Sequence, residues 1–395
     1  MITTIPAGRW PIAIGILCLG MLWIQLDSCT MRASTLQVYV GTYTGGDSEG
    51  IYVFDWDSET GKATSDVSLA AESENPSFLA LHPSKPLLYA VNETASFDGQ
   101  ESGSVSAFRI NPKGRHLEAI NQKASRGKAP CHIQIDSTGR HALIANYSSG
   151  TVSALPILED GSLGNTADVV EHLGSSVNPQ RQEGPHAHCI NLDPENRYAA
   201  AADLGVDKVF VYPFEADTGH FNLYKATSVS LKPGAGPRHL AFHPKKPYAY
   251  VINELDNTLS ALSFKTSNGK MTEIQSLSTL PDGFDETSYT AEVFFHPSGE
   301  FLYGSNRGHD SIAVFKVDSE SGKCRVIEHE STQGKTPRSF GIDPSGRFLL
   351  AANQASDSIV VFRINAQTGA AARSKTRVLP RRRRRGVARQ PVEAG

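Results

Sequence analysis

Apolar and polar residues alternate along this chain in short runs separated by turns, and one order of runs recurs through most of its length. In the clearest copy, alternation over residues 238–242 predicts a strand, and a turn at His243-Pro244 leads into a second strand over 248–253. A third strand is predicted over 259–264, and a turn ending at Gly269 leads into a fourth. Because no helical periodicity interrupts this order, each copy is predicted to form a four-stranded antiparallel sheet.

Two spacings show how often the copy occurs. Turn glycines recur at intervals of 53, 47, 58, 50, 53 and 47 residues. They are Gly61, Gly114, Gly161, Gly219, Gly269, Gly322 and Gly369. A second spacing is constant, because a His or Asp in the first turn is followed ten residues later by Asn or Asp. These pairs are His82/Asn92, Asp136/Asn146, Asp193/Asp203, His243/Asn253, His296/Asn306 and Asp343/Asn353. We interpret them as turn caps, since these side chains stabilise such turns.

A repeat of about fifty residues without helices is typical of propeller blades, which bury their apolar faces against one another. The content of 34 Gly and 22 Pro residues suits a chain that is rich in tight turns. The sequence therefore predicts an all-β fold, a seven-bladed β-propeller of four-stranded antiparallel blades, as a single domain over residues 36–372.

The first 33 residues have the pattern of a signal peptide or membrane leader. An apolar run of 17 residues from Trp10 to Leu26 follows Arg9. This pattern predicts an exported protein, periplasmic or tethered to the membrane, with no membrane contact beyond the leader. The alternative is that translation begins at Met31, which would make the protein cytoplasmic.

The other end departs from the repeat. After Gly369 the alternation of apolar and polar residues disappears, and five arginines follow from Arg381 to Arg385. We expect residues 373–395 to form a basic, disordered tail. No outer strand and no closing inner strand beside Val38-Tyr39-Val40 are recognisable there, which makes the closure of the last blade uncertain.

Composition excludes several kinds of partner and site. Residues 371–395 carry a charge of +8, which leaves −11 on residues 1–370 out of a total of −3. An acidic body argues against nucleic acid as the partner. No cysteine motif, glycine-rich phosphate loop or nucleophile elbow is present, so we expect no metal and no cofactor. His186 and His188 point to one side of a strand, as metal ligands can, but no third ligand stands at motif spacing. We expect a monomer that binds a small molecule.

Hairpin topology predicts where chemistry gathers. The start of each first strand and the end of each second strand lie at the same end of a blade. Residues five before each anchor should therefore meet residues eleven after it. The first group is Ser77, Cys131, His188, Arg238, Ala291 and Arg338, and the second is Glu93, Tyr147, Leu204, Glu254, Arg307 and Gln354. His132, His186, His239 and Glu292 stand beside these positions. So many ionisable groups on one face require a function or close pairing.

Several motifs carry a resemblance to a known family. They are Gly236-Pro237-Arg238-His239, Phe242-His243-Pro244, Tyr250-Val251-Ile252-Asn253-Glu254-Leu255, Tyr39-Val40-Gly41-Thr42-Tyr43-Thr44, Gly184-Pro185-His186-Ala187-His188, Ser305-Asn306-Arg307-Gly308 and Thr336-Pro337-Arg338. The chain from Val38 to Gly369 resembles the seven-bladed lactonase family of 6-phosphogluconolactonases and carboxymuconate-lactonizing enzymes. The signatures of the WD40 and kelch propellers are absent.

The resemblance implies a His, an Arg and a Glu at the mouth of the propeller, and these fall on His188, Arg238 and Glu254 as catalytic residues. A further Arg falls on either Arg307 or Arg338. We expect a substrate-binding set around the catalytic residues. This set is His132, His186, His239, Glu292, Arg307 and Arg338.

The function implied is hydrolysis of a sugar-acid lactone to the open acid, as in the pentose phosphate pathway of carbohydrate metabolism. His188 or Glu254 would be the base that activates water, and Arg238 would stabilise the oxyanion. Arg307 or Arg338 would hold a phosphate if the substrate carries one. One alternative is cycloisomerisation of a carboxymuconate at the same kind of site. Another is a propeller without catalysis that binds a ligand or protein on its polar face.

Overall fold

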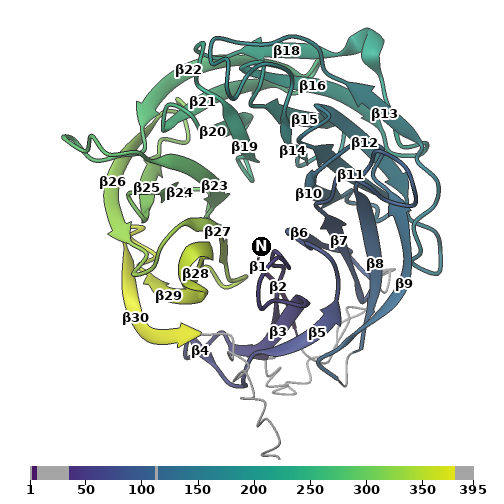
Figure 1. Ribbon diagram of the computed structural model, residues 1–395. Helices are drawn as coiled ribbons and strands as arrows, with labels where there is room; N and C mark the ends of the chain where they lie inside the picture. The colour runs from purple at the N-terminus through teal and green to yellow at the C-terminus, as the bar shows by residue number, and fades with distance from the viewer. Residues whose placement is uncertain (1, 7–34, 112–113, 379–395) are drawn as a thin grey trace, which may run out of the picture.

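The computed structural model describes residues 2–6, 35–111 and 114–378, which form a ring of seven antiparallel sheets around a central axis (Figure 1). The predicted all-β, seven-bladed propeller is confirmed. Each sheet is one blade with four strand positions, from the axis outward. Helix among these residues is limited to two 3-10 turns, Leu223–Lys225 and Gln354–Ser356. No helix that the structure describes is long and apolar enough to cross a membrane.

In each blade the four positions are filled in chain order, from the axis outward. The innermost strands are β1 (Ile2–Pro6), β6 (Phe78–Leu81), β10 (Pro130–Ile135), β14 (Ala187–Leu192), β19 (Pro237–Phe242), β23 (Tyr289–Phe295) and β27 (Pro337–Ile342). The second strands are β2 (Thr35–Val40), β7 (Leu87–Asn92), β11 (His141–Asn146), β15 (Tyr198–Asp203), β20 (Tyr248–Asn253), β24 (Phe301–Arg307) and β28 (Phe348–Asn353).

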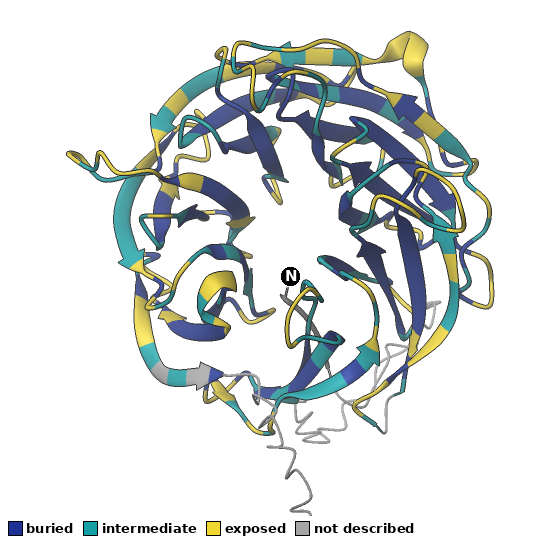
Figure 2. Ribbon diagram, viewed as in Figure 1, coloured by how far each residue is buried: buried dark blue, intermediate teal, exposed yellow. Residues whose placement is uncertain are grey.

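The two outer positions complete the blades. The third strands are β3 (Gly50–Asp57), β8 (Ser104–Ile110), β12 (Thr151–Pro156), β16 (Lys208–Glu215), β21 (Thr258–Lys265), β25 (Ser311–Val317) and β29 (Ser358–Ile364). The outermost strands are β4 (Lys62–Ala63) and β5 (Ser68–Glu72), β9 (Leu117–Ala124), β13 (Asp168–Glu171), β17 (His220–Phe221) and β18 (Thr227–Ser230), β22 (Lys270–Ser278), β26 (Cys324–Ser331) and β30 (Ala371–Val378). Burial follows these positions, because the inner strands are mostly buried and the outermost strands carry most exposed residues (Figure 2).

The seventh blade corrects one expectation. We expected no regular strand after Gly369, but β30 follows it and pairs with β29 from Ala371 to Val378. An outermost strand needs a backbone partner on one side only and faces solvent, so polar and charged residues are compatible with it. The strands therefore run past residue 372. The Arg-rich segment 379–395 lies outside the described residues.

The first blade takes its innermost strand from the N-terminal residues, ahead of its own second strand. β1 pairs antiparallel with β2, from Ile2 opposite Val40 to Pro6 opposite Leu36. It contacts β27 on one side and β6 on the other, so it fills the gap in the inner ring. This is the position beside Val38-Tyr39-Val40 for which the sequence offered no C-terminal strand. The predicted apolar run from Trp10 to Leu26 lies outside the described residues.

The glycine spacing has a packing cause. Gly61 has a φ of 69°, in the left-handed region, and a Cβ built there would lie 2.1 Å from Cε1 of Phe348 in the adjacent seventh blade. Gly369 repeats this arrangement, with a φ of 75° and a Cβ position 2.2 Å from Cδ1 of Phe301. Each glycine therefore allows both a tight turn and close contact with the first residue of a second strand in the neighbouring blade.

The first member of the ten-residue pairs caps its turn, as predicted, whereas Nδ2 of the second member Asn92 donates to Ser73 and Glu74 in the connection before its blade. Nδ1 of His82 accepts hydrogen bonds from the backbone N–H groups of Ser84 and Lys85, at 3.1 and 3.0 Å. Oδ1 of Asp136 accepts from the N–H groups of Arg140 and His141, at 2.7 and 2.8 Å. These anchors stabilise the scaffold and leave the ends of the hairpins free to position other side chains.

Candidate active site

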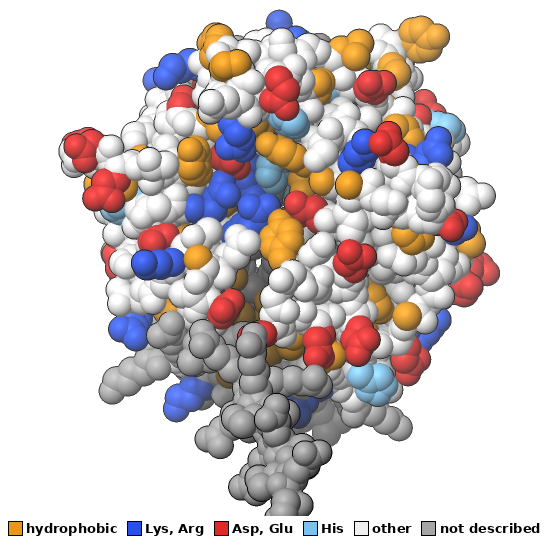
Figure 3. Space-filling view, in the orientation of Figure 1, with side chains coloured by type: hydrophobic (Ala, Val, Ile, Leu, Met, Phe, Trp, Pro, Cys, Tyr) orange, Lys and Arg blue, Asp and Glu red, His pale blue; other side chains and the backbone are white. Residues whose placement is uncertain are grey.

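Arginine and histidine side chains gather in a central hollow on one face of the ring, which we call the mouth (Figure 3). β-Bulges in the inner strands supply several of them. The pairing with the second strand skips one residue in each of β10, β14, β19 and β27. The skipped residues are Cys131, His188, Arg238 and Arg338. Because a bulge re-aims a side chain, these residues can project toward the axis without disturbing the rest of their strands.

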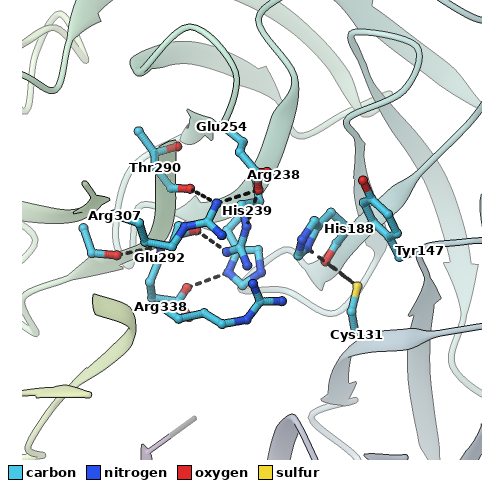
Figure 4. A network of polar contacts seen from close by, with 12 residues as sticks. Cys131, Tyr147, His188, Arg238, His239, Glu254, Thr290, Glu292, Arg307 and Arg338 are labelled. Atoms are coloured by element: carbon cyan, nitrogen blue, oxygen red, sulfur yellow. Dashed lines mark hydrogen bonds and ion pairs between the residues drawn. The ribbon is translucent and has the colours of Figure 1, made fainter. Parts of the chain in front are cut away.

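Glu254 is the carboxylate on which the arginines of the mouth converge. It follows β20 directly and is 5% exposed. Its Oε2 lies 2.9 Å from Nη2 of Arg307 and 2.9 Å from Nε of Arg238, although the latter contact lacks hydrogen-bond alignment. Its Oε1 accepts a hydrogen bond of 2.7 Å from Arg181. Residues at the start of the first strands, such as Arg238, therefore meet residues that follow the second strands, such as Glu254, as predicted (Figure 4).

This arrangement decides the protonation state of Glu254. Burial would raise its pKa, but the charges of Arg307 and Arg238 and the hydrogen bond from Arg181 outweigh burial and hold the pKa at about 2. The side chain is therefore an ionised carboxylate at neutral pH. A group with so low a pKa is a weak proton acceptor, which favours His188 over Glu254 as the base.

Arg238 is almost completely buried, at 2% exposure. Its Nη1 donates a hydrogen bond of 2.5 Å to the backbone oxygen of Ala291. No described residue accepts a hydrogen bond from its Nη2. Arg307 similarly donates from Nη2 to the backbone oxygen of Thr290, at 2.8 Å. The guanidinium groups are thus fixed by carbonyl oxygens as well as by Glu254, so they form a rigid positive wall.

Arg338 lies beside Arg307 and Glu292 in Figure 4, and its guanidinium points across the mouth toward His188. Its Nη2 donates a hydrogen bond of 2.9 Å to the hydroxyl of Tyr43, which donates in turn to Oε2 of Glu93 at 2.7 Å. The guanidinium carbon lies 5.5 Å from the centre of the Tyr43 ring. Tyr43 of the first blade and Glu93 of the second blade therefore fix the position of this arginine from the seventh blade.

His188 faces the arginines of the mouth (Figure 4). Its Nδ1 lies 3.6 Å from Sγ of Cys131, and its ring meets the ring of Tyr147 edge to face at 5.3 Å. Burial and the charge of Arg238 lower the pKa of His188 well below its usual 6.5, so the ring is neutral at pH 7. Its Nε2 has no hydrogen-bond partner among the described residues. Burial raises the pKa of Cys131, which keeps this neighbour a thiol.

A buried carboxylate–histidine pair stands beside His188. Nδ1 of His239 lies 2.7 Å from Oε1 of Glu292, and each side chain is about 5% exposed. The His239 ring is 5.3 Å from the His188 ring and 5.4 Å from the His132 ring. Burial lowers the pKa of His239 against the opposing charge of Glu292. The structure thus brings eight of the nine predicted site residues into one cluster.

The ninth, His186, lies on another face of Tyr147. Its ring stacks on the Tyr147 ring at 4.5 Å, and its Nε2 lies 3.2 Å from Oε1 of Glu183. It shares a tyrosine with His188 but not the arginine cluster. Within residues 2–6, 35–111 and 114–378, no group of three His, Cys, Asp or Glu side chains is arranged to hold a metal ion.

Sequence reasoning missed two residues of the mouth, Arg181 and Tyr43. Arg181 lies in the connection between β13 and β14, where no repeat position exists to compare with other blades. The signal available was the interval of 58 residues between Gly161 and Gly219, the longest of the six. Tyr43 was seen only as part of a motif in the opening strand region. Its partner Glu93 belongs to the second blade and its partner Arg338 to the seventh. The contacts of Tyr43 therefore depend on how the blades meet in the ring.

Comparisons with known proteins agree on one family. The family model described as lactonase, 7-bladed beta-propeller, matches residues 37–381. The 6-phosphogluconolactonase of Bacillus subtilis is 42% identical over 77% of this chain and 84% of its own length. That of Formosa agariphila is 36% identical over 78% and 86%. The solved structure of a periplasmic gluconolactonase from Pseudomonas aeruginosa superposes with a TM-score of 0.80, at 34% identity, over 87% of this chain and 96% of that one.

These matches span the ring that carries the mouth. The family model extends from β2 through β30, and so includes all the inner-strand bulges. They confirm the resemblance that the motifs around Arg238, Glu254 and His188 indicated. The chain belongs to the lactonase family of seven-bladed β-propellers.

Proposed function

We propose that this protein is a lactonase, a hydrolase that opens the ring ester of a sugar-acid lactone to the free acid. The observation that carries the proposal is a neutral His188 placed beside Arg238 and Arg338 in the mouth. A neutral imidazole can accept a proton, and adjacent guanidinium groups can stabilise negative charge as it develops. The named relatives that act on phosphogluconolactone or gluconolactone support this chemistry.

In the proposed reaction, Nε2 of His188 takes a proton from water while the water oxygen bonds to the lactone carbonyl carbon. The carbonyl oxygen becomes an oxyanion, and the free Nη2 of Arg238 donates to it. As the bond between the carbonyl carbon and the ring oxygen breaks, His188 returns its proton to that oxygen. General-base assistance of this kind is typically worth about 10²–10⁴ in rate.

The remaining residues position these groups. Glu254 holds Arg238 and Arg307 in place and offsets their charge. Glu292 orients His239, whose ring packs against His188, so this pair would fix the angle of the base. Arg307, Arg338, His132 and His186 would contact the substrate around the reacting ester.

We also propose export to the periplasm or to the membrane surface, as the apolar run from Trp10 to Leu26 indicates. The periplasmic location named for the Pseudomonas aeruginosa relative supports this proposal. An exported enzyme would work as a monomer on a soluble lactone, in line with the acidic charge of residues 1–370.

The test is an assay of gluconolactone and 6-phosphogluconolactone, each corrected for spontaneous hydrolysis. We expect His188→Gln to lose about 10²–10⁴ in kcat and Arg238→Ala to lose at least about a hundredfold. Arg140→Gln, at an exposed ion pair with Asp217, is the control and should keep the parental rate. Parental rates in both site variants would refute the mechanism. Conversion of a carboxymuconate without lactone hydrolysis would support the cycloisomerase instead.

A further inference from the structure

We propose that Arg181 is a specificity-determining residue, which binds an anionic group of the substrate and makes the site select a phosphorylated lactone over a neutral one. The inference rests on the proposed lactonase function.

Arg181 stands on an insertion. The connection from β13 to β14 covers residues 172–186, whereas the same connection covers residues 73–77, 125–129, 231–236, 279–288 and 332–336 in the other blades. The connection 172–186 is thus the longest of the six and about three times as long as the shortest. It accounts for most of the extra length between Gly161 and Gly219. Extra residues at the mouth end of one blade place new side chains there without changing the ring.

The insertion is held in one conformation. Gln182 is fully buried, and its Nε2 donates to the backbone oxygen of Leu204 at 2.9 Å. Its own backbone oxygen and Oε1 accept from the N–H groups of Ser176 and Asn178, at 3.0 and 3.1 Å. The hydroxyl of Ser176 donates to Asp207 at 2.5 Å. Arg181 is next to Gln182 in the chain, so its backbone is fixed over the mouth.

Arg181 keeps unused donors. A guanidinium has five N–H groups, and Arg181 uses only Nη2, which contacts Oε1 of Glu254 at 2.7 Å and the hydroxyl of Tyr147 at 3.4 Å. Its Nε and Nη1 groups have no partner among the residues that the structure describes. The side chain is 35% exposed, compared with 2% for Arg238 and 15% for Arg307. An exposed guanidinium with an unused face suits bidentate contact with a phosphate.

The charge of the mouth favours the same ligand. Its guanidinium groups are those of Arg181, Arg238, Arg307 and Arg338, and its carboxylates are Glu93, Glu254 and Glu292. The excess of these groups is one positive charge, because the lowered pKa of His239 leaves the charge of Glu292 uncompensated by its partner. A phosphate carries about −1.5 to −2 at pH 7 and would more than offset this excess, whereas a neutral lactone would leave it in place. The excess stands out against a body that is otherwise acidic.

The experiment compares kcat/KM for 6-phosphogluconolactone and for gluconolactone in the parent, Arg181→Gln, Arg181→Lys and Arg197→Gln. Arg197 is a matched control, because it is an exposed arginine of the same blade that pairs with Glu195. We expect the parent to prefer the phosphorylated lactone. In Arg181→Gln this preference should fall about tenfold to a hundredfold, mainly through KM, since a charge-assisted bidentate contact is lost. The preference of Arg181→Lys should lie between those of the parent and of Arg181→Gln, and the preference of Arg197→Gln should match that of the parent.

Two outcomes would overturn the inference. One is an equal loss of kcat/KM on both lactones in Arg181→Gln, which would assign Arg181 to holding Glu254 alone. The other is an unchanged preference. A parent that hydrolyses neither lactone would refute the proposed function itself, and this result is distinct from both. Melting temperatures of all four proteins show that each loss comes from folded protein.

Discussion

Replacing Glu254 by Gln tests the central electrostatic claim about the mouth. Its pKa of about 2, compared with an ordinary 4.5, corresponds to about 3 kcal/mol of stability at pH 7, at about 1.36 kcal/mol for each pKa unit. Removing this charge also leaves Arg238 and Arg307 in a buried site without their counter-ion. Breaking a buried ion pair on one side typically costs about 3–5 kcal/mol. We therefore expect Glu254→Gln to be destabilised by at least about 3 kcal/mol at pH 7.

The pH dependence has a definite sign. The pKa of Glu254 is lower in the folded than in the unfolded protein, so its contribution is complete above pH 4.5 and is lost as the pH falls toward 2. Protonation makes the parent resemble the variant, because a protonated Glu254 leaves the same arginines uncompensated. The stability gap between parent and variant should narrow by about 2 kcal/mol between pH 7 and pH 3.

The assay is urea unfolding of both proteins at a series of pH values from 7 to 3, followed by intrinsic fluorescence and circular dichroism. Glu320→Gln is the matched control, since Glu320 pairs with Lys246 at the surface and is 86% exposed. Exposed pairs contribute little, so this variant should stay within about 1 kcal/mol of the parent. A gap for Glu254→Gln that stays constant down to pH 3 would show that the carboxylate is not held ionised by the arginines.

Two further predictions concern the base and the ring. Because burial and Arg238 hold the pKa of His188 well below 6.5, kcat/KM should stay level between pH 7.5 and 6, and an acid limb centred at 6.5 or higher would contradict this. Gly61→Ala should lower the melting temperature by several degrees, at a cost of about 1–2 kcal/mol or more, because its Cβ would meet Phe348 at a left-handed φ. Gly45→Ala is the control, because no atom lies within 4 Å of the added carbon. Similar melting temperatures for these two variants would rule out the proposed contact between blades.

Much of the site could be predicted because the repeat fixes geometry. A hairpin of constant length places the residue before Glu254 opposite Pro237, and the bulge that follows aims Arg238 at the mouth. The repeat does not determine how many charged partners one side chain contacts in the folded ring. That Arg181, Arg238 and Arg307 all converge on Glu254 depends on three different elements. One of these, the insertion 172–186, is longer than the corresponding connection in any other described blade. The assignment of Glu254 as a possible base was open for this reason.

Closing the ring poses a physical problem at the N-terminal end of the chain. Without β1, strand β2 would present an unpaired edge toward the axis. The residues that solve this problem, Ile2–Pro6, belong to the same first 33 residues that have the pattern of an export leader. A leader that is cleaved after Leu26 takes β1 away with it. A mature chain therefore cannot both have lost its leader by cleavage and have its ring closed by β1. Pairing at the inner edge of β2 distinguishes a chain that retains the leader from one that has lost it.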